Sequence, residues 1–139
     1  MANEAILIIE TGSAIPFTVA EDAGIEKGAV CMLSDLMTAA TATGDEDYVA
    51  GIAASEKIAD DGKVRLGLFR EGIFKMVLSG TINAGEAVST HVATGGAANL
   101  IHRAPITASG SQTLGIAMET GAEGETILVD LKPACLTNV

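Results

Sequence analysis

The stretch that decides the fold class is VRLGLFREGIFKMVLS, residues 64–79. In its first part, Val64, Leu66 and Leu68 point to one side of an extended chain, while Arg65 and Gly67 point to the other. This period of two predicts a β-strand over residues 64–69. The three residues 70–72 that follow are few enough to connect it to a second strand, residues 73–79, as a hairpin.

The second of these strands is partly apolar on both faces. Phe74, Met76 and Leu78 lie on one face, and Ile73, Lys75 and Val77 lie on the other. An apolar face has to be buried against another layer of structure. We therefore expect this strand to be central in a sheet, or to be covered by an interface between subunits.

The rest of the chain repeats the same composition of short apolar runs between glycine-containing and acidic turns, which is typical of an all-β barrel or sandwich. An alternative for residues 45–60 is a helix, which Gly51 disfavours. We predict a compact all-β fold with short or no helices. The further predicted strands are residues 5–10, 15–19, 29–33, 37–42, 49–55, 87–92, 100–103, 113–119 and 126–131.

Three sequence matches, in the same order, indicate a degenerate internal repeat of residues 25–78 and 82–131. IEKGAV at 25–30 resembles INAGEAV at 82–88, and GIA at 51–53 recurs at 115–117. An acidic glycine turn followed by an alternating strand then occurs in both halves, over residues 61–68 and 123–131. We expect one domain over residues 23–139, in which two similar β units close on one shared core, preceded by an N-terminal arm or first strands over residues 1–22.

The length and the net charge of the chain exclude or disfavour several classes of function. The 139 residues fit one domain. The 18 acidic residues against 8 basic ones give a net charge of −10, so binding to nucleic acid or to an anionic membrane surface is disfavoured. No signal peptide or spanning segment is expected. Cys31 and Cys135 are expected to be free thiols in a reducing compartment.

The sequence contains no motif that would carry catalysis. The Gly-x-Ser-x-Gly turn and the phosphate-binding loop are absent. His91 and His102, the only histidines, have no neighbouring ligands at zinc spacing. The carboxylates fall in turns, without the alternation of a calcium loop. We expect no catalytic, cofactor-binding or metal-binding residue, no cofactor and no enzymatic activity.

The N-terminal run Ile6, Leu7, Ile8 and Ile9 is β-prone and does not alternate. One interpretation is an ordinary first strand of the fold. The other is an arm that adds to the sheet edge of another chain.

Several motifs follow one another in the chain: Gly-Ile-Ala, an acidic turn, Val-x-Leu-x-Leu, GIFKM, INAGEAV, LGIAMETG and ILVDL. Their order resembles the small capsid cement, or decoration, proteins of tailed phages, and this resemblance covers residues 25–131. The segment 51–78 is also similar to lambda-like head decoration proteins.

The resemblance implies a structural virion protein, made in the host cytoplasm, that binds the major capsid protein on the outside of a phage head as homotrimers. On this basis we expect Ile6, Leu7, Ile8 and Ile9 to contact the capsid or a neighbouring subunit. We place Ile73, Phe74 and Met76 in the trimer interface. The alternatives are a phage-head module that recognises a host-surface glycan, and a non-catalytic β-clip accessory domain.

Overall fold

The computed structural model describes residues 3–43, 48–91, 99–103 and 112–135, with the backbone alone for Arg103 and Cys135. Every regular element in these residues is a β-strand, which confirms the all-β prediction. The strands fall at the predicted places, and residues 49–53 form a strand where a helix was the alternative. They are β1 (Ile6–Ile9), β2 (Ile15–Thr18), β3 (Val30–Asp35), β4 (Thr38–Thr41), β5 (Val49–Ala53), β6 (Arg65–Phe69), β7 (Gly72–Val77), β8 (Ala87–His91), β9 (Leu100–Arg103), β10 (Gln112–Ala117) and β11 (Thr126–Cys135).

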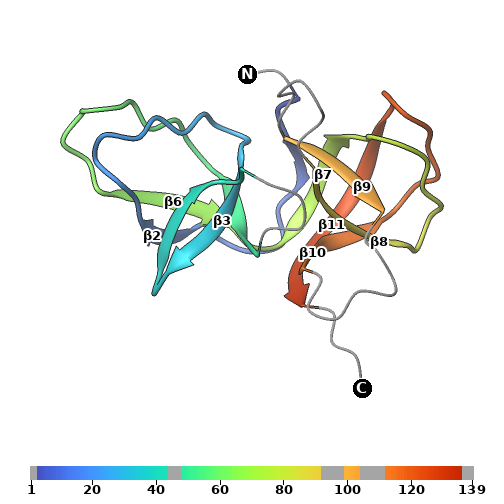
Figure 1. Ribbon diagram of the computed structural model, residues 1–139. Coiled ribbons are helices and arrows are strands. Elements are labelled where there is room, and N and C mark those ends of the chain that lie inside the picture. The colour runs from blue at the N-terminus through green and yellow to red at the C-terminus, as the bar shows by residue number, and fades with distance from the viewer. Residues whose placement is uncertain (1–2, 44–47, 92–98, 104–111, 136–139) are drawn as a thin grey trace.

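The strands form two β units that lie side by side (Figure 1). The first, which we call the N-terminal barrel, is closed in the order β2-β4-β3-β5-β6. A parallel bridge between Thr18 and Thr38 closes it. The second, which we call the C-terminal sheet, has six strands in the order β1-β7-β11-β10-β8-β9. A parallel bridge between Leu78 and Ile101 brings its β7 and β9 ends together.

The same strand pairing occurs in both units. The order β4-β3-β5-β6-β2 in the barrel matches β9-β8-β10-β11-β7 in the sheet, and β1 is the additional strand. Loop hydrogen bonds match as well. Gly28 N donates to Ala53 O at 2.9 Å, and Gly85 N donates to Ala117 O at 2.8 Å. Both glycines have positive φ, of 82° and 91°, a conformation that glycine adopts without steric cost.

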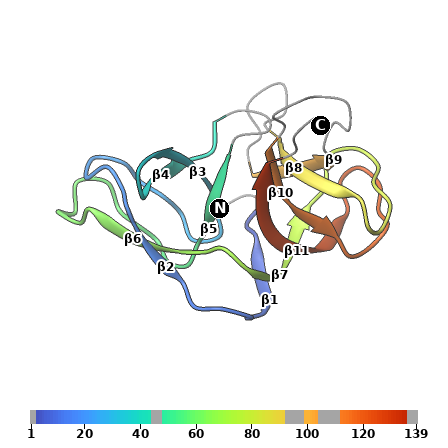
Figure 2. The same cartoon turned by 90° about the horizontal axis from the view of Figure 1, so that it is seen from below.

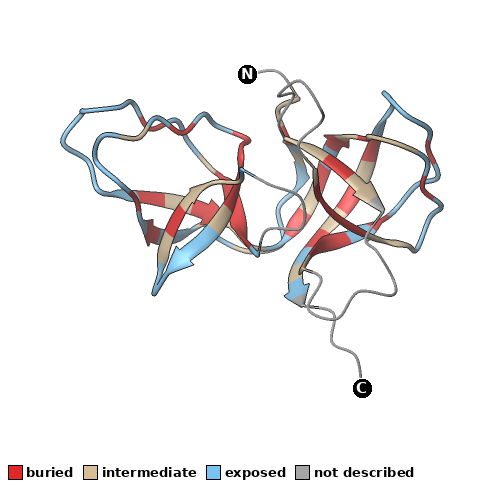
Figure 3. Ribbon diagram, in the orientation of Figure 1, coloured by how far each residue is buried: buried red, intermediate tan, exposed pale blue. Residues whose placement is uncertain are grey.

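The apolar interior consists of two clusters, where the sequence analysis expected one shared core. Strand β5 is buried along its whole length because it contributes to both (Figure 3). Its Ala50 and Ala53 lie in the barrel cluster, whereas Val49 and Ile52 lie in the cluster of the C-terminal sheet. Seen from below, β5 faces the C-terminal sheet (Figure 2). The two units are therefore packed together through apolar contacts.

The predicted hairpin of residues 64–69 and 73–79 is wrong. Strand β6 pairs with β2 and β5, while β7 pairs with β1 and β11. The short connection carries the chain from one unit to the other. Arg70 Nη1 donates to Ala50 O at 2.8 Å and so keeps the end of β6 on the barrel. Gly72 then turns the chain away with a φ of 133°.

Candidate functional site

Strand β1 contains the four N-terminal residues for which the sequence predicted an intermolecular contact. It pairs with β7 of the same chain and stands first in the sheet order, so its other edge has no strand partner among the described residues. The side chains of Ile6, Ile8 and Ile9 are exposed, whereas Leu7 packs against the core. β1 is thus an edge strand of the chain's own C-terminal sheet, and three of its isoleucines are exposed.

The predicted trimer-interface residues are divided between the two faces of β7. Phe74 and Met76 are 1% and 0% exposed and belong to the core of the C-terminal sheet. Their side chains are covered within the chain, because they pack against the other members of the apolar cluster of the C-terminal sheet. This corrects the argument that placed them in an interface. Ile73, on the outer face, remains partly exposed.

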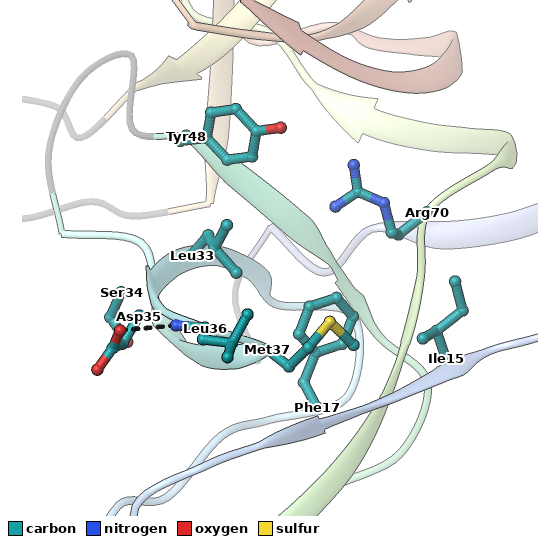
Figure 4. A pocket seen from close by; sticks show the side chains of 9 residues that line it. All are labelled: Ile15, Phe17, Leu33, Ser34, Asp35, Leu36, Met37, Tyr48 and Arg70. Carbon is teal, nitrogen blue, oxygen red and sulfur yellow. Dashed lines mark hydrogen bonds between the residues drawn. The ribbon is translucent and has the colours of Figure 1, made fainter.

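A further apolar surface lies on the N-terminal barrel, and we call it the hairpin groove. Its volume is about 500 Å³. Ile15, Leu33, Met37, Tyr48 and Arg70 surround it, with Phe17 at its base (Figure 4). Ser34, Asp35 and Leu36 complete the lining.

The turn between β3 and β4 shapes this groove. It has the apolar residues Leu36 and Met37 at its tip, where glycine, asparagine and aspartate are the usual residues. Leu36 is 86% exposed, and Met37 has a φ of 48°. Asp35 Oδ1 accepts a hydrogen bond from Leu36 N at 2.7 Å, and Thr38 Oγ1 donates to Leu36 O at 3.0 Å. Polar neighbours thus hold two apolar side chains out in solvent, which is typical of a surface that binds a partner.

The opposite wall of the groove is formed by Tyr48 and Arg70. Both side-chain types are enriched among the residues that dominate protein interfaces. The hydrogen bond from Arg70 to Ala50 O holds the guanidinium in place. The sequence analysis missed this groove. The available signal was the apolar Leu36, which lies between the predicted strands 29–33 and 37–42 and is followed by Met37.

The fold brings the two histidines of the chain together. The rings of His91 and His102 stack with their centroids 4.8 Å apart. No group of three or more His, Cys, Asp or Glu side chains in the described part could hold a metal ion. No described helix is long and apolar enough to span a membrane. Cys31 is buried, and the side chain of Cys135 lies outside the described residues.

A family model and a solved structure that match this chain both describe phage proteins. A family model described as "phage cement protein" matches residues 9–132 of this chain. The fold is similar to that of the head fiber gp8.5 N base in bacteriophage phi29, with a TM-score of 0.53 and 15% sequence identity over 89% of this chain and 98% of that one. At this identity the likeness concerns the fold. No curated protein matches the chain.

Proposed function

Since the chain belongs to the phage cement protein family, we propose that it is a decoration protein of the outer surface of a phage head. In this proposal it binds the major capsid protein as a homotrimer, stabilises the shell and catalyses no reaction. The family match agrees with the resemblance found in the motif order. The net charge of −10 suits a position outside the shell better than one beside packaged DNA.

The observation that carries the capsid contact is the exposed edge strand β1. An unpaired strand edge offers a row of main-chain donors and acceptors to another chain. Addition of such a strand to a capsid sheet would supply affinity without a deep pocket. Ile6, Ile8 and Ile9 would then pack against apolar side chains of the shell. Three β1 strands on one trimer would raise the apparent affinity through effective concentration.

Substitutions on β1 test this proposal better than a truncation does. Removal of residues 1–10 would also remove Ala5, which is buried and whose N donates to Gly28 O at 3.1 Å, and Leu7, which packs on the core. The substitution Ile8→Asp changes an exposed side chain and leaves these contacts in place. Ile58→Asp is the matched control, because Ile58 is exposed at 64% and lies in the loop between β5 and β6.

The measurement is co-sedimentation of the purified protein with phage heads that lack it. The wild-type protein and Ile58→Asp should bind and should raise the temperature at which the heads rupture. Ile8→Asp should lose most of this binding while its own melting temperature is retained. A wild-type protein that does not bind heads would contradict the proposed function. Unchanged binding of Ile8→Asp would contradict only the role of β1.

A further inference from the structure

Strands β5 with β6, and β10 with β11, correspond residue by residue. Ile52 pairs with Phe69, and Ile116 pairs with Asp130. A Cβ atom on Gly51 would overlap the carbonyl oxygen of Phe69, and one on Gly115 would overlap that of Asp130. The hydrogen bonds two residues further along also match. Ala54 N donates to Gly67 O at 3.0 Å in the barrel, and Met118 N donates to Leu128 O at 2.8 Å in the C-terminal sheet. Ile52 and Phe69 are therefore equivalent to Ile116 and Asp130.

The two equivalent surfaces have different surroundings. In the barrel, Ile52 is 0% exposed because this surface packs against the C-terminal sheet, where the rings of Phe69 and Phe74 lie 6.1 Å apart. In the C-terminal sheet, Ile116 is 41% exposed and Met118 is exposed as well. We call the surface formed by Ile116, Met118, Leu128 and Asp130 the Ile116 face.

Within the chain, β5 and β6 of the barrel pack against the C-terminal sheet at Phe74. The barrel has a residue that is equivalent to Phe74. Phe74 pairs with Val129, the residue before Asp130, and Ile15 pairs with Leu68, the residue before Phe69. Ile15 is therefore the barrel's equivalent of Phe74. Ile15 is exposed and lines the hairpin groove. The position of the groove on the barrel is thus equivalent to the position on the C-terminal sheet against which β5 and β6 pack.

We propose that the Ile116 face of one copy packs into the hairpin groove of a second copy. This contact would repeat between chains the packing that already joins the two units within one chain. A second copy is the occupant that this correspondence identifies, because one chain carries both members of the pair with their apolar residues exposed. Both surfaces carry charges of both signs: Asp130 of the face lies 3.2 Å from the Lys132 ammonium, and the groove is lined by Arg70 and Asp35.

A contact between two different surfaces joins copies head to tail and closes into a ring when the rotation allows it. The number three rests on the proposed function. In a trimeric ring each chain would use its Ile116 face once and its groove once. Neither surface would then be left open to solvent.

The test is the mass in solution of two single variants and of their mixture. The wild-type protein should have three times the chain mass of 14.0 kDa. Ile116→Asp and Ile15→Asp should each give monomers at the same concentration, because both substituted side chains are exposed and the fold tolerates them. An equimolar mixture of the two variants retains one intact pair of surfaces, so it should give dimers and no trimers. Ile58→Asp should behave as the wild type.

Two results would overturn the proposal: a wild-type mass for either interface variant, or a mixture that stays monomeric. A trimer that forms only transiently is captured by a chain carrying Ile15→Cys, Ile116→Cys and Cys135→Ser. Mild oxidation should link this chain into dimers and trimers, but should not link the control with Ile58→Cys in place of Ile15→Cys. Failure to link also overturns the proposal.

Head binding distinguishes this inference from the proposed function. If the wild-type protein decorates heads and Ile116→Asp remains trimeric, the interface assignment fails while the function holds. If the wild-type protein forms trimers through these surfaces but does not bind heads, the function fails while the interface holds.

Discussion

Asn99 and Val30 join the two β units through a single side chain. Oδ1 of Asn99, at the start of β9, accepts a hydrogen bond from the backbone N of Val30 in β3 at 2.7 Å. Nδ2 of the same residue donates to Asn3 O at 2.6 Å and to Gly28 O at 3.0 Å. Asn99 also has a φ of 63°, which asparagine tolerates better than most residues.

The first prediction concerns this junction. Asn99→Gly should lower the free energy of unfolding by about 1–3 kcal/mol, because it removes the side-chain acceptor of the Val30 N–H and the amide that donates to the carbonyls of Asn3 and Gly28. Asn99→Ala should be less stable again by about 1 kcal/mol, since alanine disfavours positive φ. Urea denaturation measures both. Equal stability of Asn99→Ala and the wild type would contradict the role of Asn99.

The second prediction concerns Lys57, whose side chain is buried. Its Nζ donates to the carbonyls of Glu21 at 2.8 Å and Ala23 at 3.1 Å, and lies 3.3 Å from Asp61 Oδ1. Lys57→Met should cost about 1.5–3 kcal/mol of stability, the range for hydrogen bonds to charged groups. Lys63→Met, at an exposed lysine in the same loop, is the control and should change stability by less than about 0.5 kcal/mol.

The third prediction is a pH dependence that comes from Asp61. The backbone N–H of Lys63, which donates to Oδ1 at 2.9 Å, and the nearby Lys57 ammonium lower the pKa of this carboxyl. A lowered folded-state pKa contributes stability above the ordinary value of about 3.9, and this contribution is lost as the pH falls through the folded-state pKa. Asp61→Asn should therefore lose less stability than the wild type as the pH falls below about 4, in acid titrations followed by circular dichroism. Parallel curves would contradict the assignment.

The fourth prediction concerns the thiol of Cys31. Burial raises its pKa to about 12, so the thiolate that reacts is scarce at neutral pH. In a Cys135→Ser background, the native protein should not react with a thiol reagent at pH 8 over hours. The same protein in denaturant, without reductant, should react with one equivalent. Rapid labelling of the native protein would show that Cys31 is accessible.

The fifth prediction uses the two equivalent glycines. Gly51→Ala and Gly115→Ala should each destabilise the protein by about 1–3 kcal/mol, because the new methyl group meets the backbone of the neighbouring strand. Gly62→Ala is the comparison, since the space around Gly62 is open and only its φ of 78° opposes a side chain. It should cost about 1 kcal/mol. Thermal melts rank the three variants, and a neutral Gly115→Ala would contradict the strand equivalence.

The strands and the family could be predicted from the sequence because both depend on local order. Alternation such as that of Leu66 and Leu68 reports which side of an extended chain is apolar, and each predicted stretch overlaps a strand. The motif order along residues 25–131 likewise indicated the family that the match over residues 9–132 shows.

Only the tertiary structure decided which strands pair and which apolar side chains stay exposed. Residues 64–69 and 73–79 are separated by a turn of hairpin length, yet Arg70 and Gly72 direct the second strand into the other unit. Phe74 and Met76 are core residues because the apolar cluster that buries them is built by strands from distant parts of the chain. Ile52 and Ile116 share the same local sequence, Gly-Ile-Ala, but one is buried and the other exposed. Burial depends on neighbours brought together by the fold, and a local pattern contains no information about them.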